Sequence, residues 1–474
     1  MFLNRYRKYL YAFIVFISLA LRLFALGRSS YWIDEMVSVH FAKSPYWGSI
    51  FWDNSPFLYH LILKAWVHWF GDTEVATRFL SVIFSTSTTG LLIYFGNRYF
   101  GVIAACAMGV FHGISPFSVY YAQETRMYAL FEMFTTLNMI FFYQVWNREH
   151  KKIKYGVSLF LLSLTHYLSV VPIVAQVGFF ALKEKKAKDS IKPILIIGLT
   201  LATTLVSYLK FFSLKHLNWQ IVKFEIEPRS HWPTDILWSL FNESWISLIG
   251  FIILISFFIW NLRKANLKTL LKGSGFFAPF VILPIVAFTA ATLVLNRSML
   301  LPRYLIFTLP YMVSWTGLTL ALTVARPHIK IFEKRLLYLS FLMITTGGFI
   351  GLKENYLPHK APWREVAATI GQYTESTVFT TRTESIKTPY FERLGINVEK
   401  LENRSQMTEK VKEALAHFRN VWVIETYLAG ITYFSTIKSE FEKAGLSTKE
   451  FTVKNDYSEP IFVMLIQNPI PKTP

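Results

Sequence analysis

Long apolar stretches recur along the first 352 residues and are separated by short segments rich in Lys and Arg. An α-helix needs about 20 apolar residues to cross the roughly 30 Å hydrocarbon core of a bilayer. The pattern therefore predicts eleven membrane spans. They lie at about residues 9–26, 78–96, 101–118, 127–146, 155–166, 167–182, 193–210, 236–260, 275–294, 304–324 and 336–352.

The pattern changes after residue 352, where the apolar runs shorten to strand length. Strands are expected at Thr377–Thr381, Val421–Ile424 and Ile461–Ile466, with helices at Thr408–Phe418 and Ile431–Ala444. Short strands that alternate with helical stretches are typical of an α/β fold. The sequence thus predicts a polytopic α-helical membrane domain over residues 1–352 and a small soluble α/β domain over residues 353–474.

Composition agrees with a membrane protein. Of the 474 residues, 53% are hydrophobic and only 17% are charged, whereas soluble globular proteins carry roughly 25% charged residues. The high apolar content also excludes a disordered or collagen-like chain. Cys106 is the only cysteine, so no intramolecular disulfide can form and cysteine usage gives no information on the redox compartment.

The distribution of positive charge predicts the orientation in the membrane. If all eleven spans form, the loops on the side of the N-terminus hold 21 Lys and Arg in 53 residues, and the opposite loops hold 9 in 93. Because positively charged loops stay in the cytoplasm, we expect a multi-pass protein of the cytoplasmic (inner) membrane with a cytoplasmic N-terminus. An odd number of spans then places the C-terminal domain outside. The net charge of +19 is thus a topology signal, and no nucleic-acid partner is expected.

Three carboxylates stand out in the long first outer loop, residues 27–77. Asp34 and Glu35 are adjacent and follow the first span directly, and Asp53 lies in the segment Trp52-Asp53-Asn54-Ser55-Pro56. Carboxylates at a membrane boundary are costly to bury and are commonly functional where they face a cavity. The alternative is that all three are solvated loop charges.

The same loop carries an aromatic run from Phe57 to Phe70. Ser55 and Pro56 suit a helix N-cap and first turn, and the apolar residues behind them recur at helical spacing. This pattern predicts a helix that lies in the membrane interface, where aromatic rings are favoured. The alternative is a lid that only packs against its neighbours.

A short outer segment between two predicted spans is unusually polar. It reads Tyr120-Tyr121-Ala122-Gln123-Glu124-Thr125-Arg126-Met127-Tyr128, whereas an ordinary turn needs only Gly, Pro, Asn or Ser. Gln123, Glu124, Arg126 and Tyr128 are therefore candidate substrate-binding residues. The alternative is a structural ion pair between Glu124 and Arg126.

Three further candidates lie on the predicted outer side. His166 sits where two short spans meet, Arg303 belongs to a basic turn, and Arg364 follows the last span. Arginine suits phosphate because its planar fork makes paired charge-assisted hydrogen bonds, and a carboxylate suits general-base work on a hydroxyl. A lone histidine such as His166 is more often a packed or hydrogen-bonded residue. No nucleotide-binding motif is present, so a lipid phosphate is the expected carrier of an activated group outside the cytoplasm.

These motifs resemble those of family 39 glycosyltransferases, polytopic enzymes of the C-type superfamily. The resemblance rests on three runs: Trp32-Ile33-Asp34-Glu35, Asp53-x-x-Pro56-x-Leu58-Tyr59 and Tyr121-Ala122-Gln123-Glu124-x-Arg126-x-Tyr128. The family includes protein O-mannosyltransferases, lipid A aminoarabinose transferases and Rgt-type transferases, and its members use polyprenyl-phosphate sugars. Many members carry His and a second Pro where this chain has Ser55 and Phe57.

The resemblance implies inverting transfer of one sugar from a polyprenyl phosphate to a hydroxyl of a lipid, glycan or protein acceptor. It implies that Asp34 is the general base and that Glu35 and Asp53 orient the base or the acceptor. Arg126 and Arg303 would hold the donor phosphate, helped by Arg364. Some C-type relatives use a divalent ion and others do not. Mg²⁺ or Mn²⁺ would suit the hard oxygen ligands of these carboxylates, and the sequence leaves metal use open.

Two other classes of protein share part of this pattern. A transporter or flippase of a lipid-linked sugar would have the same spans, aromatic residues and basic groups, but transporters often show internal repeats and interrupted helices at the midplane. The charged groups here cluster at one predicted face and no repeat is evident, which favours the enzyme. A receptor or scaffold would not need such a site.

Overall fold

The computed structural model describes residues 2–51, 53, 55–149, 151–183, 233–262, 273–295, 301–380, 389–401, 407–426, 437–454 and 461–468. The chain divides into two compact units, which are considered separately below. We call Met1–Phe24, Ile50–Ile62 and Arg78–Asn355 the helical unit. We call Ala25–Ser49, Leu63–Thr77 and Tyr356–Pro474 the sheet unit.

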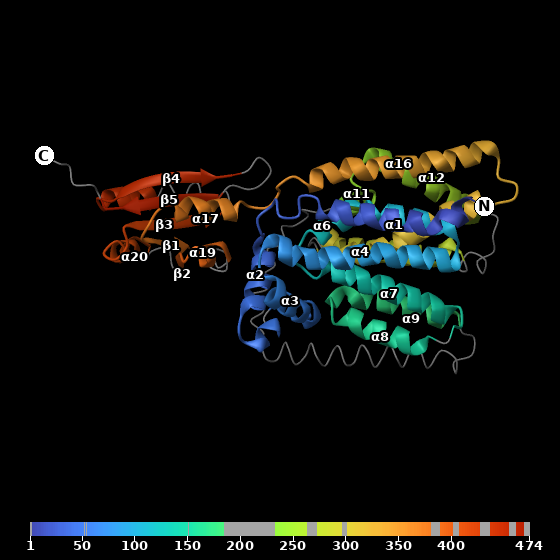
Figure 1. The fold of residues 1–474 in the computed structure, drawn as a ribbon, viewed down its shortest axis with the longest axis horizontal. Helices are drawn as coiled ribbons and strands as arrows, with labels where there is room; N and C mark the ends of the chain where they lie inside the picture. The colour runs from blue at the N-terminus through green and yellow to red at the C-terminus, as the bar shows by residue number, and fades with distance from the viewer. Residues whose placement is uncertain are drawn as a thin grey trace. The chain divides into compact units, whose positions relative to one another are not determined.

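The helical unit is a bundle whose long helices run side by side (Figure 1). Two helices are shared between the units: α3 (Phe57–Phe70) begins and α4 (Glu74–Tyr99) ends in the helical unit. The other elements are α1 (Phe2–Leu23), α5 (Val102–Gly113), α6 (Pro116–Ala122), α7 (Tyr128–Trp146), α8 (Lys152–Ser163), η2 (Tyr167–Ser169), α9 (Val170–Lys183), α11 (Pro233–Leu240), α12 (Trp245–Leu262), η3 (Ser274–Phe276), α14 (Pro279–Leu295), η4 (Pro302–Thr308), α15 (Leu309–Val324) and α16 (Ile331–Asn355).

Ten of the eleven predicted spans coincide with helices of the described chain, and the span predicted at 193–210 lies outside the described residues. Among the described residues, four helices are long and apolar enough to cross a membrane, or up to six if each bent pair of helices counts as one span. The polytopic helical architecture is therefore confirmed. The count of eleven spans stays a prediction.

Two spans that the sequence predicts as single runs are bent in the structure. α5 and α6 meet at 58°, and α11 and α12 meet at 87°. The first bend occurs where Pro116 begins α6, because proline inside a continuous helix would lose a hydrogen bond and clash with the preceding turn. The second occurs at Asn242 and Glu243, whose φ angles of 62° and 51° cannot continue a right-handed helix.

A buried arginine stabilises the first bend. Arg22 is fully buried, and its guanidinium donates to the backbone oxygens of Gly113 at 2.9 Å and His112 at 3.3 Å. The last carbonyl groups of a helix lack intrahelical partners, and a cation near them is favourable. His112 in turn contacts Glu132 at 3.0 Å. We read this network as structural, because it satisfies the polar groups that the bend leaves inside the bundle.

Segments that the sequence predicts on the cytoplasmic side lie at the same end of the helical unit. The N-terminus and the turn between α15 and α16 share that end in Figure 1. Side-chain hydrogen bonds connect two more of these segments to that end: Tyr11 of α1 donates to Asn97 at 2.8 Å, and Tyr99 donates to Glu149 at 3.0 Å. The arrangement agrees with the alternation of loops along the sequence.

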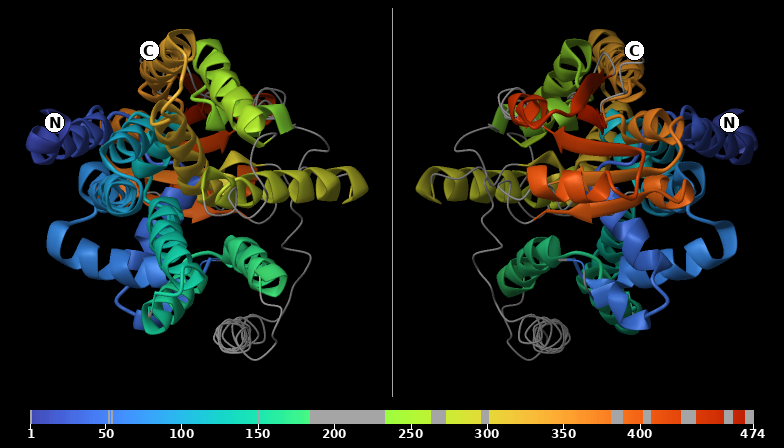
Figure 2. Two further views of the ribbon diagram at one scale, coloured as in Figure 1. Left: turned by 90° about the vertical axis from the view of Figure 1, so that its right-hand side faces the viewer. Right: turned by 90° about the vertical axis from the view of Figure 1, so that its left-hand side faces the viewer.

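The surface of the helical unit exposes large apolar side chains. α14 extends away from the other helices in Figure 2, and Ile282, Leu283, Val286, Leu293 and Val294 on it are all exposed. Exposed apolar residues also occur along α1, α12 and α16. Contiguous apolar surface of this kind is a membrane- or partner-binding feature, and on helices this apolar it fits lipid contact.

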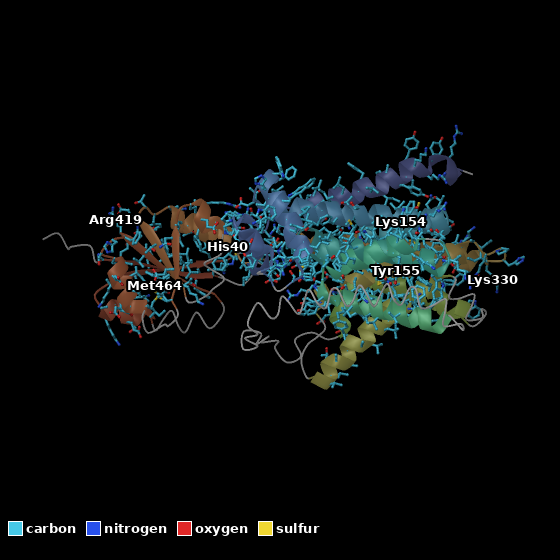
Figure 3. The ribbon with its side chains drawn as sticks, turned by 90° about the horizontal axis from the view of Figure 1, so that it is seen from below. His40, Lys154, Tyr155, Lys330, Arg419 and Met464 are labelled. Carbon is cyan, nitrogen blue, oxygen red and sulfur yellow. The ribbon has the colours of Figure 1, made fainter. Side chains whose placement is uncertain are left out.

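Cysteine labelling tests the orientation. With Cys106 replaced by Ala, single cysteines at the exposed residues Lys154 and Lys330 should react only with membrane-permeant reagents. A cysteine at the exposed Arg419 should react with impermeant ones (Figure 3 labels all three positions). Impermeant labelling of position 154 or 330 in intact cells would reverse the predicted topology.

The sheet unit is built on an α/β core. Within the described residues its strands are β1 (Ser376–Thr380), β2 (Asn397–Lys400), β3 (Asn420–Thr426), β4 (Ser447–Val453) and β5 (Ile461–Gln467). They form one sheet in the order β2-β1-β3-β5-β4. β1 pairs in parallel with β2 and β3, whereas β5 pairs antiparallel with β3 and β4. Strands are therefore confirmed at all three predicted positions, and the small C-terminal sheet with them.

Two hydrophobic cores cover the two faces of this sheet. Alternate residues of β3 point to opposite faces, so Trp422 joins one core and Val423 the other. The first core also contains residues of α17 (Trp363–Gly371) and α19 (Pro389–Arg393). The second contains residues of α20 (Met407–Ala414), the helix predicted at Thr408–Phe418. The helix predicted at Ile431–Ala444 is helical over 437–443, and its remainder is mostly outside the described residues.

Part of the first predicted outer loop folds into the same unit. α2 (Ile33–Lys43) contributes Met36 and Val39 to the core that contains Trp363 and Trp422, and Tyr31 lies in it as well. The candidate carboxylates Asp34 and Glu35 are thus positioned by packing against the C-terminal sheet. Assignment of residues 353–474 to a separate extracytoplasmic domain stays a proposal.

Candidate functional site

Asp53 is the centre of a buried polar cluster in the helical unit. Its side chain is 7% exposed, and Oδ2 accepts a hydrogen bond from Arg126 Nη1 at 3.0 Å. Oδ1 accepts from the backbone N–H of Ser55 at 2.9 Å and from its hydroxyl at 2.8 Å. The Ser55 hydroxyl also contacts His60 Nε2 at 2.8 Å. Arg126 is therefore held by Asp53, a carboxylate that lies 73 residues earlier in the chain.

Local sequence explains how these groups meet. Ser55 and Pro56 precede α3, and His60 lies in the first turns of that helix, so its ring reaches back to the Ser55 side chain. Arg126 comes from the turn between α6 and α7. The backbone N–H of Leu58 donates to the carbonyl of Leu164 at 3.3 Å, which fixes the start of α3 against the loop before η2.

Burial and the neighbouring charges set the protonation of this cluster, which lies in the predicted outer loop. Burial alone would raise the pKa of Asp53, but the charge of Arg126 and the hydrogen bonds from Ser55 hold it well below its usual range. Burial lowers the pKa of His60 to about 4, and the charge of Arg126 acts in the same direction, against Asp53. At neutral pH the cluster therefore contains a carboxylate, a guanidinium and a neutral imidazole.

This protonation pattern predicts a pH-dependent stability. An imidazole whose folded pKa lies below its unfolded value of about 6.5 stabilises the fold fully above that value, and the contribution is lost as pH falls toward 4. The His60 contribution should fall by about 2 kcal/mol between pH 7 and pH 5. Thermal unfolding in detergent should therefore show a smaller pH dependence for His60→Gln than for the wild type. Parallel losses in both proteins would contradict the assignment.

His166 is fully buried and follows α8. The charges of Arg126 and Arg303 both act on its ring and on the phenol of Tyr167. His166 Nδ1 accepts a hydrogen bond from the backbone N–H of Leu168 at 3.1 Å, so the neutral ring carries its proton on Nε2. That Nε2–H group is buried and has no hydrogen-bond partner in the described part of the chain.

Aromatic rings surround the same group. Phe131 stacks on His166 with ring centroids 4.9 Å apart, and Tyr128 lies at 6.1 Å. Tyr121 packs edge-on against Tyr128 at 5.0 Å. The Arg303 guanidinium carbon lies 5.6 Å from the centroid of the Tyr304 ring. Cationic side chains and aromatic ring faces thus occur together. A phosphate joined to a sugar or a lipid would need both for binding.

Two other candidate residues, Gln123 and Glu124, make contacts within the fold of the helical unit. The Gln123 amide donates to the backbone oxygens of Arg22 at 3.0 Å and Phe24 at 2.7 Å, and so it caps the end of α1. Glu124 is buried, and its backbone oxygen accepts from the Ser81 hydroxyl at 2.6 Å. Glu124 also acts electrostatically on Tyr121, as Arg303 does. A substrate contact through the Gln123 amide nitrogen would have to break the cap on α1.

The remaining candidates lie in the sheet unit. Glu35 is fully buried, where it accepts from the backbone N–H of Trp32 at 3.2 Å and pairs with Lys360 at 2.9 Å. It therefore closes the first turn of α2. Asp34 occupies the same turn and is partly exposed. Arg364 pairs with Glu74 at 3.2 Å and donates to the backbone oxygen of Gly27 at 3.2 Å.

The sequence leaves the use of a divalent cation open. No group of three or more His, Cys, Asp or Glu side chains converges among the residues that the structure describes. The Lys360 ammonium already neutralises Glu35, so this carboxylate is a poor candidate for a metal ligand. Metal use therefore stays a prediction, and the steps proposed below use side chains alone.

Sequence reasoning missed Ser55, His60 and Lys360 as members of these clusters. His60 lies within the aromatic run that predicts an interfacial helix, and nothing in its spacing marks it as polar chemistry. Lys360 is 325 residues from Glu35, and one sequence carries no signal for such a pair. The available cue was the short polar run Asp53-Asn54-Ser55 ahead of an apolar helix.

Comparison with solved structures shows which fold this is. The chain matches the crystal structure of ArnT from Cupriavidus metallidurans in the apo state with a TM-score of 0.63 and 13% identity, over 96% of this chain and 97% of that chain. The structure of the same protein bound to undecaprenyl phosphate gives a TM-score of 0.60 and 12% identity, over 96% of this chain and 97% of that chain. The Archaeoglobus fulgidus oligosaccharyltransferase in complex with Zn and sulfate gives 0.50 and 10%, over 87% of this chain and 67% of that chain.

No protein-family model and no curated protein matches the sequence. The similarity is therefore one of structure, and at this identity it concerns the fold. The predicted resemblance to the C-type glycosyltransferases, which include ArnT, is confirmed at that level: the chain has a fold similar to theirs over nearly its whole length.

Proposed function

We propose that the protein transfers one sugar from a polyprenyl-phosphate donor to a hydroxyl of a lipid, glycan or protein acceptor at the outer face of the cytoplasmic membrane. The observation that carries this proposal is that the charges of Arg126 and Arg303 both act on the buried His166, whose Nε2–H has no hydrogen-bond partner in the described residues, within a fold similar to that of ArnT. The ArnT structure bound to undecaprenyl phosphate supplies the class of carrier.

The phosphate would be held by these three groups. A phosphate leaving group needs positive charge and hydrogen-bond donors rather than a general acid, because negative charge develops on it as the bond to the sugar breaks. Arg126 is oriented by its bond to Asp53, and Asp53 therefore acts on the substrate through Arg126. The sequence predicts that Asp53 orients the base or the acceptor, and we propose instead that it positions Arg126.

The acceptor hydroxyl requires a base on the opposite face of the sugar ring, and we assign that part to Asp34. Inverting transfer follows from such an arrangement, since the hydroxyl attacks from the side opposite the phosphate. Asp34 is the candidate carboxylate with partial exposure, whereas Glu35 is fully buried and paired with Lys360. Glu35 then positions α2 rather than the acceptor.

Membrane placement completes the proposal. We infer eleven spans, a cytoplasmic N-terminus and an extracytoplasmic location of residues 353–474. Two observations support this: Lys and Arg are concentrated in alternate loops, and the segments predicted as cytoplasmic lie at one end of the helical unit. No feature of the described residues specifically favours a transporter.

Mass spectrometry of membrane glycolipids and glycoproteins tests the proposal in cells. Cells that lack the gene should lose one sugar from a glycoconjugate, wild-type protein should restore it, and Asp34→Asn should not. Identical glycoconjugate profiles with and without the gene would contradict the proposed function.

A further inference from the structure

The cluster around Asp53 holds a second buried imidazole nitrogen, His60 Nδ1. His60 is 2% exposed, and Nδ1 has no hydrogen-bond partner among the residues that the structure describes. A buried polar atom without a partner is destabilising and rare in folded proteins. The Asp53 carboxylate, the Ser55 hydroxyl and His60 Nε2 are all hydrogen-bonded within the cluster, so the Nδ1 atom calls for a ligand.

Hydrogen bonding within the cluster determines which nitrogen of His60 carries the proton. The Ser55 hydroxyl has a single hydrogen, and it donates that hydrogen to the Asp53 carboxylate at 2.8 Å, an acceptor that cannot donate in return. The 2.8 Å contact between Ser55 Oγ and His60 Nε2 must then use the hydrogen on Nε2. Nδ1 is therefore left as an unprotonated acceptor.

His60 and His166 thus carry opposite groups at the nitrogens that have no partner among the described residues. His166 offers an N–H donor and His60 offers a lone pair, and the charge of Arg126 acts on both rings. A phosphate oxygen can satisfy the first but not the second, because it has no hydrogen to donate. The complement of His60 Nδ1 is an uncharged donor, and a hydroxyl group is the donor that the proposed substrates carry.

We propose that His60 Nδ1 accepts a hydrogen bond from a hydroxyl group of the substrate, and that Asp53 and Ser55 fix the tautomer that makes this possible. The inference rests on the proposed function and names one recognition contact within it. The hydroxyl belongs either to the transferred sugar or to the acceptor. His60 is a binding residue in this scheme and not the base, since a pKa of about 4 leaves it a weak proton acceptor at neutral pH.

Two substitutions separate the two nitrogens. Asn places an amide oxygen one bond beyond Cγ, where Nδ1 lies, whereas Gln places its amide one bond further, where Nε2 lies, and has no polar atom at the Nδ1 position. His60→Gln should therefore raise the KM for either the donor or the acceptor by about threefold to tenfold, the change expected for one neutral hydrogen bond. His60→Asn should stay within about twofold of wild type, and kcat should change little in both variants.

The assay uses purified protein with polyprenyl-phosphate mannose, glucose and arabinose as donors, and polyprenyl phosphate without sugar as a binding control. A higher KM for the donor in His60→Gln assigns the hydroxyl to the transferred sugar, and a higher KM for the acceptor assigns it to the acceptor. Binding of polyprenyl phosphate should be equal in wild type and in both variants, which also shows that they are folded.

The failures are distinguishable. If the wild type transfers a sugar and neither KM changes in His60→Gln, or both variants lose affinity equally, the hydroxyl contact is wrong and the proposed function stands. If the wild type transfers none of the three sugars, and cells with and without the gene also have identical glycoconjugate profiles, the proposed function fails, and the inference that rests on it fails too.

Discussion

Asp34→Asn should abolish sugar transfer almost completely while leaving the protein inserted, folded and able to bind donor. The substitution keeps the size of the side chain and removes its capacity to accept a proton. A general base contributes about 10²–10⁴ in rate, so the loss should be at least of that order. Single-turnover rates with saturating donor measure it directly.

Glu35→Gln is the matched control, because it changes the neighbouring carboxylate in the same turn of α2. Glu35 is fully buried and paired with Lys360, and breaking a buried ion pair costs roughly 3–5 kcal/mol. We therefore expect Glu35→Gln to lower the thermal stability and Asp34→Asn to leave it nearly unchanged. Near-wild-type turnover in Asp34→Asn would refute its assignment as the base.

Arg303→Lys should weaken use of the donor by about tenfold to a hundredfold. Lysine keeps the charge but cannot reproduce the planar fork that binds two phosphate oxygens, and a charge-assisted hydrogen bond contributes about 1.5–3 kcal/mol. The effect should appear as a higher KM for the donor, with expression matched to wild type. Arg126→Lys should show at least the same loss, because it also disturbs the bond to Asp53.

Arg326→Lys provides the comparison for these variants. Arg326 lies between α15 and α16, in a turn at the end of the helical unit that holds the N-terminus, so its substitution should leave the donor KM unchanged. If Arg303→Lys, Arg126→Lys and the double variant all keep the wild-type dependence on donor concentration, the phosphate clamp is wrong and both arginines are structural.

The sequence predicted the helices far better than their bends. Apolar runs of sufficient length identify membrane helices because the bilayer imposes the length. The bend between α11 and α12 depends on backbone angles at Asn242 and Glu243, which hydrophobicity does not report. Pro116 was a visible signal for the other bend, but it lies within an apolar run that satisfied the length criterion.

The strands of the sheet were also predicted only where the sequence is apolar. β1, β3 and β5 occupy central positions and read as apolar runs, whereas β2 and β4 form the edges of the sheet and were not predicted. Their sequences, Asn397–Lys400 and Ser447–Val453, alternate with polar residues because an edge strand is largely exposed. Short polar strands of this type resemble loops in a single sequence.

The candidate site could be predicted by residue type but not by pairing. The motifs pointed to Asp53, Arg126, His166 and Arg303, and the structure gathers these in the helical unit. Glu124 was considered as the partner of Arg126 because it is two residues away, yet the structure gives Arg126 a bond to Asp53. Such a pair depends on tertiary packing. The same holds for the hydrogen bonds of His60 and His166, whose Nδ1 and Nε2 atoms respectively have no partner within the described parts of the chain.

Transfer by the purified chain in liposomes tests the central claim most directly. The protein would be supplied with a polyprenyl-phosphate sugar and with acceptor lipids from its own membrane, and the products separated and their anomeric configuration determined. The account predicts release of polyprenyl phosphate together with a glycosylated acceptor whose new linkage has the inverted configuration. Movement of the intact lipid-linked sugar across the bilayer, with no polyprenyl phosphate released, would contradict it and identify a flippase instead.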